Sequence, residues 1–319
     1  RDVLPMQSYP QFHSQLEKSF LGTTIPAQAT PDPEGSLRIA LDRIAAHPNV
    51  GTFIGRQLIQ RLVTSNPSTA YIARVSAAFD GGRFTLGGWS VGTGVRGDLK
   101  ATVVAVLMDP EARGVSPPPV PAAVGKVREP IARMLAWMRA FNARSTSEGE
   151  RWQLGTLDSP ATQLGQSPMR SPSVFNFYRP GYVPPNTAIA TAGLVSPEFQ
   201  ILHESSVVGY ANFMRTAVSS GLGALVPITP GTTTPTRADI QPDYTAELAL
   251  ADNPAALVDR VNLLLTGNSM SDATRADILQ AVQAIALTGT AAQIDAAKLN
   301  RVRTAVFLGL VAPEFVVQR

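Results

Sequence analysis

Apolar residues recur at three- and four-residue spacings along most of the chain, which is the periodicity of amphipathic helices. Residues of the expected type mark several boundaries, because Ser36, Ser68 and Asp98 can cap helix N-termini and Gly267 and Gly289 can end helices. The spacing predicts helices over about 36–46, 50–63, 69–79, 98–108, 130–141, 196–220, 253–265, 271–287 and 291–310. We therefore expect a mainly α fold, an irregular multi-helix domain with long loops rich in proline and glycine and a C-terminal helical subdomain.

Four stretches lack this helical period. The first 35 residues hold five prolines and should be extended, and the glycine-rich stretch 80–97 should be a surface loop. Residues 116–121 contain four prolines, which predicts a stiff connector of polyproline type. The stretch 144–193 is also irregular, but its aromatic residues, Trp152 among them, indicate that it packs against the helices.

A tract rich in threonine and proline, beginning at Pro227, is the best internal linker in the chain. It predicts a main helical domain over 1–226, which includes the extended N-terminal segment and the irregular segment 144–193. The linker then covers 227–243, and a three-helix subdomain covers 244–319.

Composition narrows the classes of chemistry open to the protein. The 319 residues include no cysteine, so a disulfide framework, a thiolate metal cluster and a cysteine nucleophile are excluded. Of the 27 basic residues only Lys18, Lys100, Lys126 and Lys298 are lysine, and the arginines are scattered, so we expect no nucleic-acid partner. The sequence has no run of 18 apolar residues, so we expect no transmembrane segment.

One motif points to nucleophilic catalysis. The stretch 88–92 matches G-x-S-x-G, in which Ser90 would be the nucleophile, His203 the base and Asp158 the third member. That chemistry needs a sharp turn between a strand and a helix, whereas no β-rich run precedes Ser90 and a glycine-rich loop follows it. A plain loop is the favoured interpretation.

The three histidines, His13, His47 and His203, show no metal-binding spacing, so we expect no metal site and no cofactor. His47 is expected to cap a helix C-terminus and His203 to be structural, with catalytic roles for both as the alternative. The carboxylates of Asp239, Asp243 and Glu247 could group around a cation, although solvated loop carboxylates are the better interpretation.

A cluster of rings offers a candidate binding surface, made of Phe175, Phe177, Tyr178, Arg179 and Tyr182. Rings beside proline and arginine give contact area at low entropic cost, as interface anchors do. The competing interpretation, which we favour, is that these rings fix the irregular segment onto the helices.

Several stretches together resemble one family, the bacterial "domain of unknown function 1800" proteins. The resemblance is carried by 21–22, 41–42, 47–54, 61–63, 97–100, 125–130, 165–166, 171–182 and 313–318, among them Gly-Lys-Val-Arg-Glu-Pro at 125–130 and Ser-Pro-Ser-Val-Phe-Asn-Phe-Tyr-Arg-Pro-Gly-Tyr at 171–182. It implies export from the cytoplasm and frequent encoding beside a sulfatase-like "domain of unknown function 1501" protein, and it supplies no catalytic residues. The chain is similar to the C-terminal portion of such a protein, so the missing N-terminal portion of the same precursor is a further expected partner.

These observations favour a secreted, periplasmic or cell-surface protein with a structural or interaction role in a larger assembly. Its expected partners are itself or the sulfatase-like protein. The alternative is a hydrolase that acts on an extracellular polymer, with Ser90 or His47 and His203 in catalytic roles.

Overall fold

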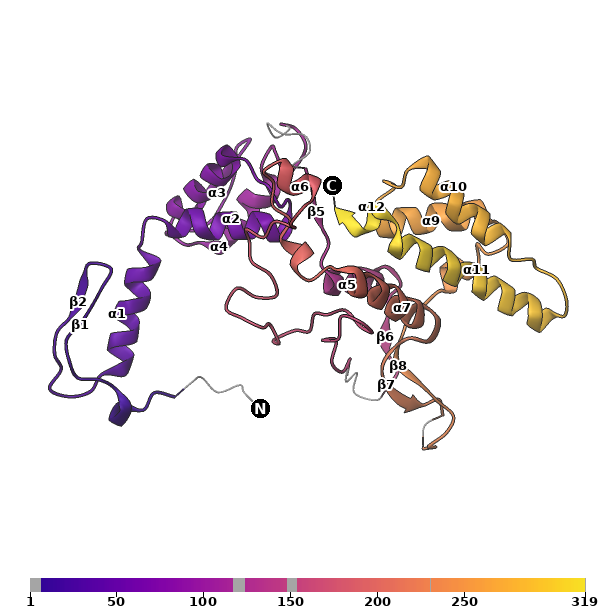
Figure 1. The fold of residues 1–319 in the computed structure, drawn as a ribbon, viewed down its shortest axis with the longest axis horizontal. Coiled ribbons are helices and arrows are strands. Elements are labelled where there is room, and N and C mark those ends of the chain that lie inside the picture. The colour runs from indigo at the N-terminus through magenta and orange to yellow at the C-terminus, as the bar shows by residue number, and fades with distance from the viewer. Residues whose placement is uncertain (1–6, 117–123, 148–153, 230, 319) are drawn as a thin grey trace. The chain divides into compact units, whose positions relative to one another are not determined.

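The computed structural model describes residues 7–116, 124–147, 154–229 and 231–318 (Figure 1). The chain divides into two compact units, the first made of 1–63 and 67–121 and the second of 64–66 and 122–319. Most of the proline-rich stretch 116–121 and Trp152 lie outside the described residues. None of the helices in the described residues combines the length and the hydropathy that a membrane span requires.

The first unit is built around three helices. Its core consists of Ile59 from α2, Tyr71, Val75 and Ala78 from α3, and Ala105 and Val106 from α4. Helices α2 and α3 approach closely because α2 carries glycine at the contact, where a Cβ on Gly55 would lie 3.1 Å from Val75 Cγ1. The elements are η1 (Pro10–Phe12), β1 (Lys18–Phe20), β2 (Thr23–Ile25), α1 (Pro33–Ala45), α2 (Val50–Leu62), α3 (Thr69–Gly81), β3 (Phe84–Leu86), β4 (Trp89–Val91) and α4 (Leu99–Met108).

Helix α1 differs from the sequence prediction in its cap. Asp32 caps the helix by accepting from the backbone N–H of Gly35, whereas Ser36 is buried and its hydroxyl bonds to His13. The apolar face of this helix is exposed, since Leu37 is 57% and Ile44 50% accessible. Periodicity identified the helix correctly, but the described residues leave its apolar stripe uncovered.

The glycine-rich stretch 80–97 contains more structure than a plain loop. Strands β3 and β4 pair antiparallel, with Phe84 opposite Val91, and Gly87 and Gly88 form the turn between them. Both glycines have positive φ, 54° and 84°, which is the backbone that a two-residue hairpin turn requires.

The second unit holds the remaining elements. Strand β5 pairs antiparallel with β9, and β8 lies between β6 and β7 in a three-stranded sheet. The elements are β5 (Lys126–Val127), α5 (Pro130–Ala140), β6 (Arg144–Ser145), α6 (Ala188–Thr191), η3 (Pro197–Gln200), α7 (Glu204–Ser220), β7 (Leu222–Pro227), β8 (Thr236–Gln241), α8 (Thr245–Leu248), α9 (Pro254–Thr266), α10 (Asp272–Gln283), α11 (Ala291–Val311), α12 (Pro313–Val316) and β9 (Val317–Gln318).

One hydrophobic core runs through this unit and joins both sides of the predicted linker. Trp137 from α5, Met214 from α7, Val261 from α9 and Val306 from α11 all belong to it and are fully buried. Much of 227–243 forms strand β8 and its hairpin with β7. The compact division therefore falls near residue 121, in contrast to the predicted boundary between a 1–226 domain and a 244–319 subdomain.

The predicted helix over 196–220 is broken in two. The turn η3 ends at Gln200, and α7 begins after His203, whose extended backbone makes it the N-cap residue. Continuous apolar spacing across 199–214 hid this break. The mainly α prediction is confirmed in its coarse form, while the four small sheets of the described residues show that the fold is not strictly all-helical.

Candidate functional site

The structure places Ser90 on a hairpin. It is the central residue of β4, it is exposed, and its hydroxyl accepts a long hydrogen bond of 3.4 Å from Thr85 on the paired strand. The G-x-S-x-G motif therefore lies on β-hairpin backbone, not on the strand-to-helix turn that exposes a nucleophile in hydrolases.

The two candidate histidines have local roles. His47 lies in the first unit, where its Nδ1 accepts from the backbone N–H of Asn49 at 3.2 Å. His203 lies in the second unit, is exposed, and is the N-cap residue of α7. Its backbone N–H donates to Ser206 Oγ at 2.8 Å. Asp158 pairs with Arg170 at 2.7 Å. Among the described residues of the first unit, no hydrogen bond joins Ser90 to His47.

The three carboxylates considered as cation ligands each have protein partners. Burial alone would raise the pKa of Asp239, but hydrogen bonds from Ser145, Ser147 and Thr146 outweigh it and hold that pKa below its ordinary value. Asp243 accepts from the N–H of Thr245, and Glu247 pairs with Arg260 at 3.1 Å. In the described part of the chain, no group of three or more histidines and carboxylates is placed to hold a metal ion.

The segment 125–130 joins the elements of the second unit. Lys126 Nζ lies 3.2 Å from Glu198 Oε1, and both side chains are almost fully buried. The guanidinium of Arg128 stacks over Phe315 at 5.0 Å, and burial lowers the pKa of Arg128. Glu129 accepts from the Tyr178 hydroxyl at 2.5 Å. One short stretch thus anchors η3, α12 and the aromatic segment.

Sequence reasoning missed this joining segment, although two signals were present. Lysine is scarce in this chain, and the V-x-P-E-F pattern occurs twice, at 195–199 and 311–315. In both copies the proline starts a helical turn and the glutamate contacts a residue distant in the sequence. Glu198 forms an ion pair with Lys126, and Glu314 accepts hydrogen bonds from Ser271 and Thr274. Each copy is therefore an anchoring turn within the second unit.

Two cavities border the joining segment. One, of about 270 Å³, is lined by Lys126 together with Ser65, Ile189, Leu194 and Phe199. The other, of about 310 Å³, is lined by Arg128, Thr266, Ser269 and Glu314. Both mix polar and apolar walls.

The aromatic segment separates into anchors and exposed residues. Tyr178 is 3% exposed, so its ring is buried and its hydroxyl is held by Glu129, while Phe177 and Tyr182 are partly buried. Val174 is 96% and Phe175 52% exposed, and the Arg179 guanidinium lies 5.6 Å over the Phe175 ring. We call Val174, Phe175 and Arg179 the loop face.

The backbone holds the loop face in place. Asn176 adopts a left-handed conformation with φ 68°, and its N–H donates to Ser173 O, which closes a tight turn. The N–H of Arg179 donates to Gln200 Oε1 at 2.8 Å. The exposed residues are thus carried on an ordered turn, with a buried tyrosine as its anchor.

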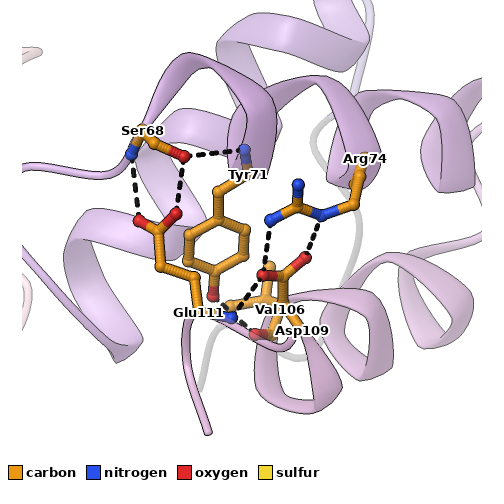
Figure 2. Close-up of polar contacts among 6 residues, drawn as sticks. All are labelled: Ser68, Tyr71, Arg74, Val106, Asp109 and Glu111. Carbon is orange, nitrogen blue, oxygen red and sulfur yellow. Dashed lines mark hydrogen bonds and ion pairs between the residues drawn. The ribbon is translucent and has the colours of Figure 1, made fainter. Parts of the chain in front are cut away.

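A second polar cluster, in the first unit, has a different character (Figure 2). Ser68 caps α3 and is itself held by Glu111, which accepts from Ser68 Oγ at 2.5 Å and from Ser68 N at 3.0 Å. Arg74 forms a bidentate pair with the buried Asp109, at 2.7 and 2.8 Å. The Tyr71 hydroxyl donates to Val106 O, and burial raises the pKa of Tyr71 far above its ordinary value. We call this the α3–α4 network.

Fold and site together define a mainly helical protein that displays an apolar and basic loop face on an anchored turn. The chain belongs to the family described as "Protein of unknown function (DUF1800)", whose model matches residues 4–317. The predicted resemblance is thereby confirmed over nearly the whole chain. No curated protein and no solved structure matches the chain.

Proposed function

We propose that this protein is an exported interaction protein that binds a protein partner through its loop face. The observation that carries this proposal is the contrast within one segment, where Tyr178 is buried and Val174 and Phe175 are left in solvent. Covering apolar residues with a partner stabilises the complex by about 25 cal/mol per Å² of apolar surface buried. An ordered turn loses little further entropy when it binds.

The residue types of the loop face suit a protein partner. Phenylalanine and arginine are enriched at the centres of protein interfaces, and an arginine stacked on a ring presents a flat surface with hydrogen-bond donors at its edge. The Arg179 guanidinium over Phe175 has this arrangement. The partners that we propose are a second copy of this chain or the sulfatase-like protein expected beside it, in the periplasm, at the cell surface or in the medium.

The test compares two aspartate substitutions of exposed apolar residues in the second unit. Phe175→Asp charges the loop face, and Leu225→Asp charges β7, where Leu225 is 72% exposed. We expect Phe175→Asp to weaken self-association in sedimentation velocity, or co-purification of the sulfatase-like protein, by about tenfold or more. Leu225→Asp should leave both unchanged. Equal behaviour of the two variants in both assays would refute the proposal.

A further inference from the structure

A groove on the second unit has apolar walls and a basic rim. It lies where α7 packs against α11, next to the end of α10 (Figure 1), and has a volume of about 440 Å³. Its apolar lining comes from Val218, Ile285, Phe307 and Leu308, and its charged lining from Arg215 and Arg303.

The two arginines are not neutralised by nearby carboxylates. Among the described residues, no acidic side chain lines the groove. The sequence explains why, since it has no aspartate or glutamate from 205 through 238 or from 296 through 313, the stretches that supply most of α7 and the C-terminal half of α11. Both walls of the groove therefore contribute positive charge only.

Arg303 has an unused donor. Its Nη2 donates to Ser219 O at 2.6 Å, which fixes the guanidinium against the end of α7. Its Nε is buried and has no hydrogen-bond partner among the described residues. A guanidinium with a buried, unpaired N–H has part of its positive charge uncompensated, which favours an anion beside it. Arg215 is exposed and makes no hydrogen bond or ion pair to the described residues.

We infer that this groove binds a monocarboxylate with an apolar tail. The carboxylate would pair with the guanidinium groups of Arg303 and Arg215, in the charge-assisted geometry that these groups favour. The tail would lie on Val218, Ile285, Phe307 and Leu308. The arrangement of a mostly apolar lining with a few polar groups that fix orientation is typical of small-molecule sites.

A single negative charge fits the groove better than a phosphate. Sites for doubly charged phosphates usually draw on backbone N–H groups at a helix N-terminus. Here the rim lies at the C-terminal end of α7, at Val218 and Ser219, where the helix dipole is negative. The Ser219 carbonyl already occupies one guanidinium N–H of Arg303.

Calorimetric titration of the full chain with decanoate, and with 1-decanol as the uncharged probe, tests the inference. We expect wild-type protein to bind decanoate about tenfold more tightly than decanol. Arg303→Met and Arg215→Met keep much of the aliphatic stem and remove the charge, and each should weaken decanoate binding about tenfold while leaving decanol binding unchanged. Arg237→Met, which removes an exposed charge from β8, is the matched control and should change neither affinity.

The Arg215 variant keeps the test decisive if Arg303→Met disturbs folding, because Arg215 supports no other described group. Failure of decanoate to bind, or equal decanoate affinity in wild type and Arg215→Met, would overturn the inference. Tighter binding of decyl phosphate than of decanoate would overturn the assignment to a carboxylate. Phe175→Asp should bind decanoate as wild type does, so this inference and the proposed function fail independently.

Discussion

The α3–α4 network and the loop face both combine aromatic and charged side chains, yet they use them in opposite ways. In the network, Asp109 is 3% exposed, Glu111 holds Ser68, and the Tyr71 hydroxyl is bonded to a carbonyl, so its polar groups are satisfied within the unit. In the aromatic segment, the anchor Tyr178 is buried and bonded to Glu129, whereas the side chains of Val174 and Phe175 on the loop face remain in solvent. Polar groups that are all hydrogen-bonded within the unit, as in the network, indicate a structural role. Apolar side chains that are held on an ordered turn and left exposed, as on the loop face, indicate a surface for a partner.

The largest effect should come from Asp109→Ala in the network. The change removes both hydrogen bonds to Arg74, and we expect it to destabilise the first unit by about 2–3 kcal/mol. The figure is at the low end for a buried pair because Arg74 is 47% exposed and can be hydrated. Amide hydrogen exchange in peptides from α3 and α4 measures it. Asp42→Ala, an exposed carboxylate of α1, is the control, and unchanged protection in Asp109→Ala would show that the network is not structural.

An intermediate effect is expected for Tyr178→Phe, which removes the bond to Glu129 and keeps the ring. A hydrogen bond to a charged group contributes about 1.5–3 kcal/mol, so exchange should accelerate in peptides covering 171–182. The matched control is Tyr182→Phe, because the Tyr182 hydroxyl makes no hydrogen bond to the described residues. If both variants exchange alike, Tyr178 is not the anchor of the loop face.

A smaller effect, tied to pH, is expected at Asp98, the N-cap residue of α4. Hydrogen bonds from the backbone N–H of Ala101, then from Thr93, lower the pKa of Asp98 to about 2 from the ordinary 3.8. Because the folded pKa is the lower one, its stabilisation is complete above about pH 4 and is lost as the pH falls toward 2. Asp98→Asn keeps an acceptor but cannot titrate, so thermal melts of the first unit should depend less on pH in this range. An identical pH dependence in the variant would contradict this assignment.

The smallest effect on stability is expected for Phe175→Asp. Substitutions of exposed residues usually change the free energy of unfolding by less than about 0.5 kcal/mol. Urea unfolding of the second unit should therefore match that of wild type. A large loss of stability would mean that Phe175 serves packing, and the contrast with the network would disappear.

Local signals predicted much of the fold. Ser68, Asp98 and Gly267 cap helices as expected, because capping depends on residues within one helical turn. The exposed stripe of α1 and the break before His203 were missed, since spacing alone does not say what covers a face or where a helix is interrupted.

The candidate site was predicted less well. The sequence shows the aromatic residues of this segment directly. Which of them is the buried anchor and which are exposed depends on Glu129, which is 49 residues away from Tyr178 in the chain. The pairing of Lys126 with Glu198 and the unmet donor of Arg303 are likewise products of tertiary packing. Periodicity carries no information about such contacts.

The most direct test of the loop face is site-specific photocrosslinking in cells that produce the protein naturally. A photoreactive phenylalanine analogue would replace Phe175 in one sample and Leu225 in the other, both exposed and both in the second unit. We predict that position 175 crosslinks to one defined protein, either a second copy of this chain or the sulfatase-like protein, and that position 225 does not. Absence of a crosslink at position 175, or the same products from both positions, would contradict the account.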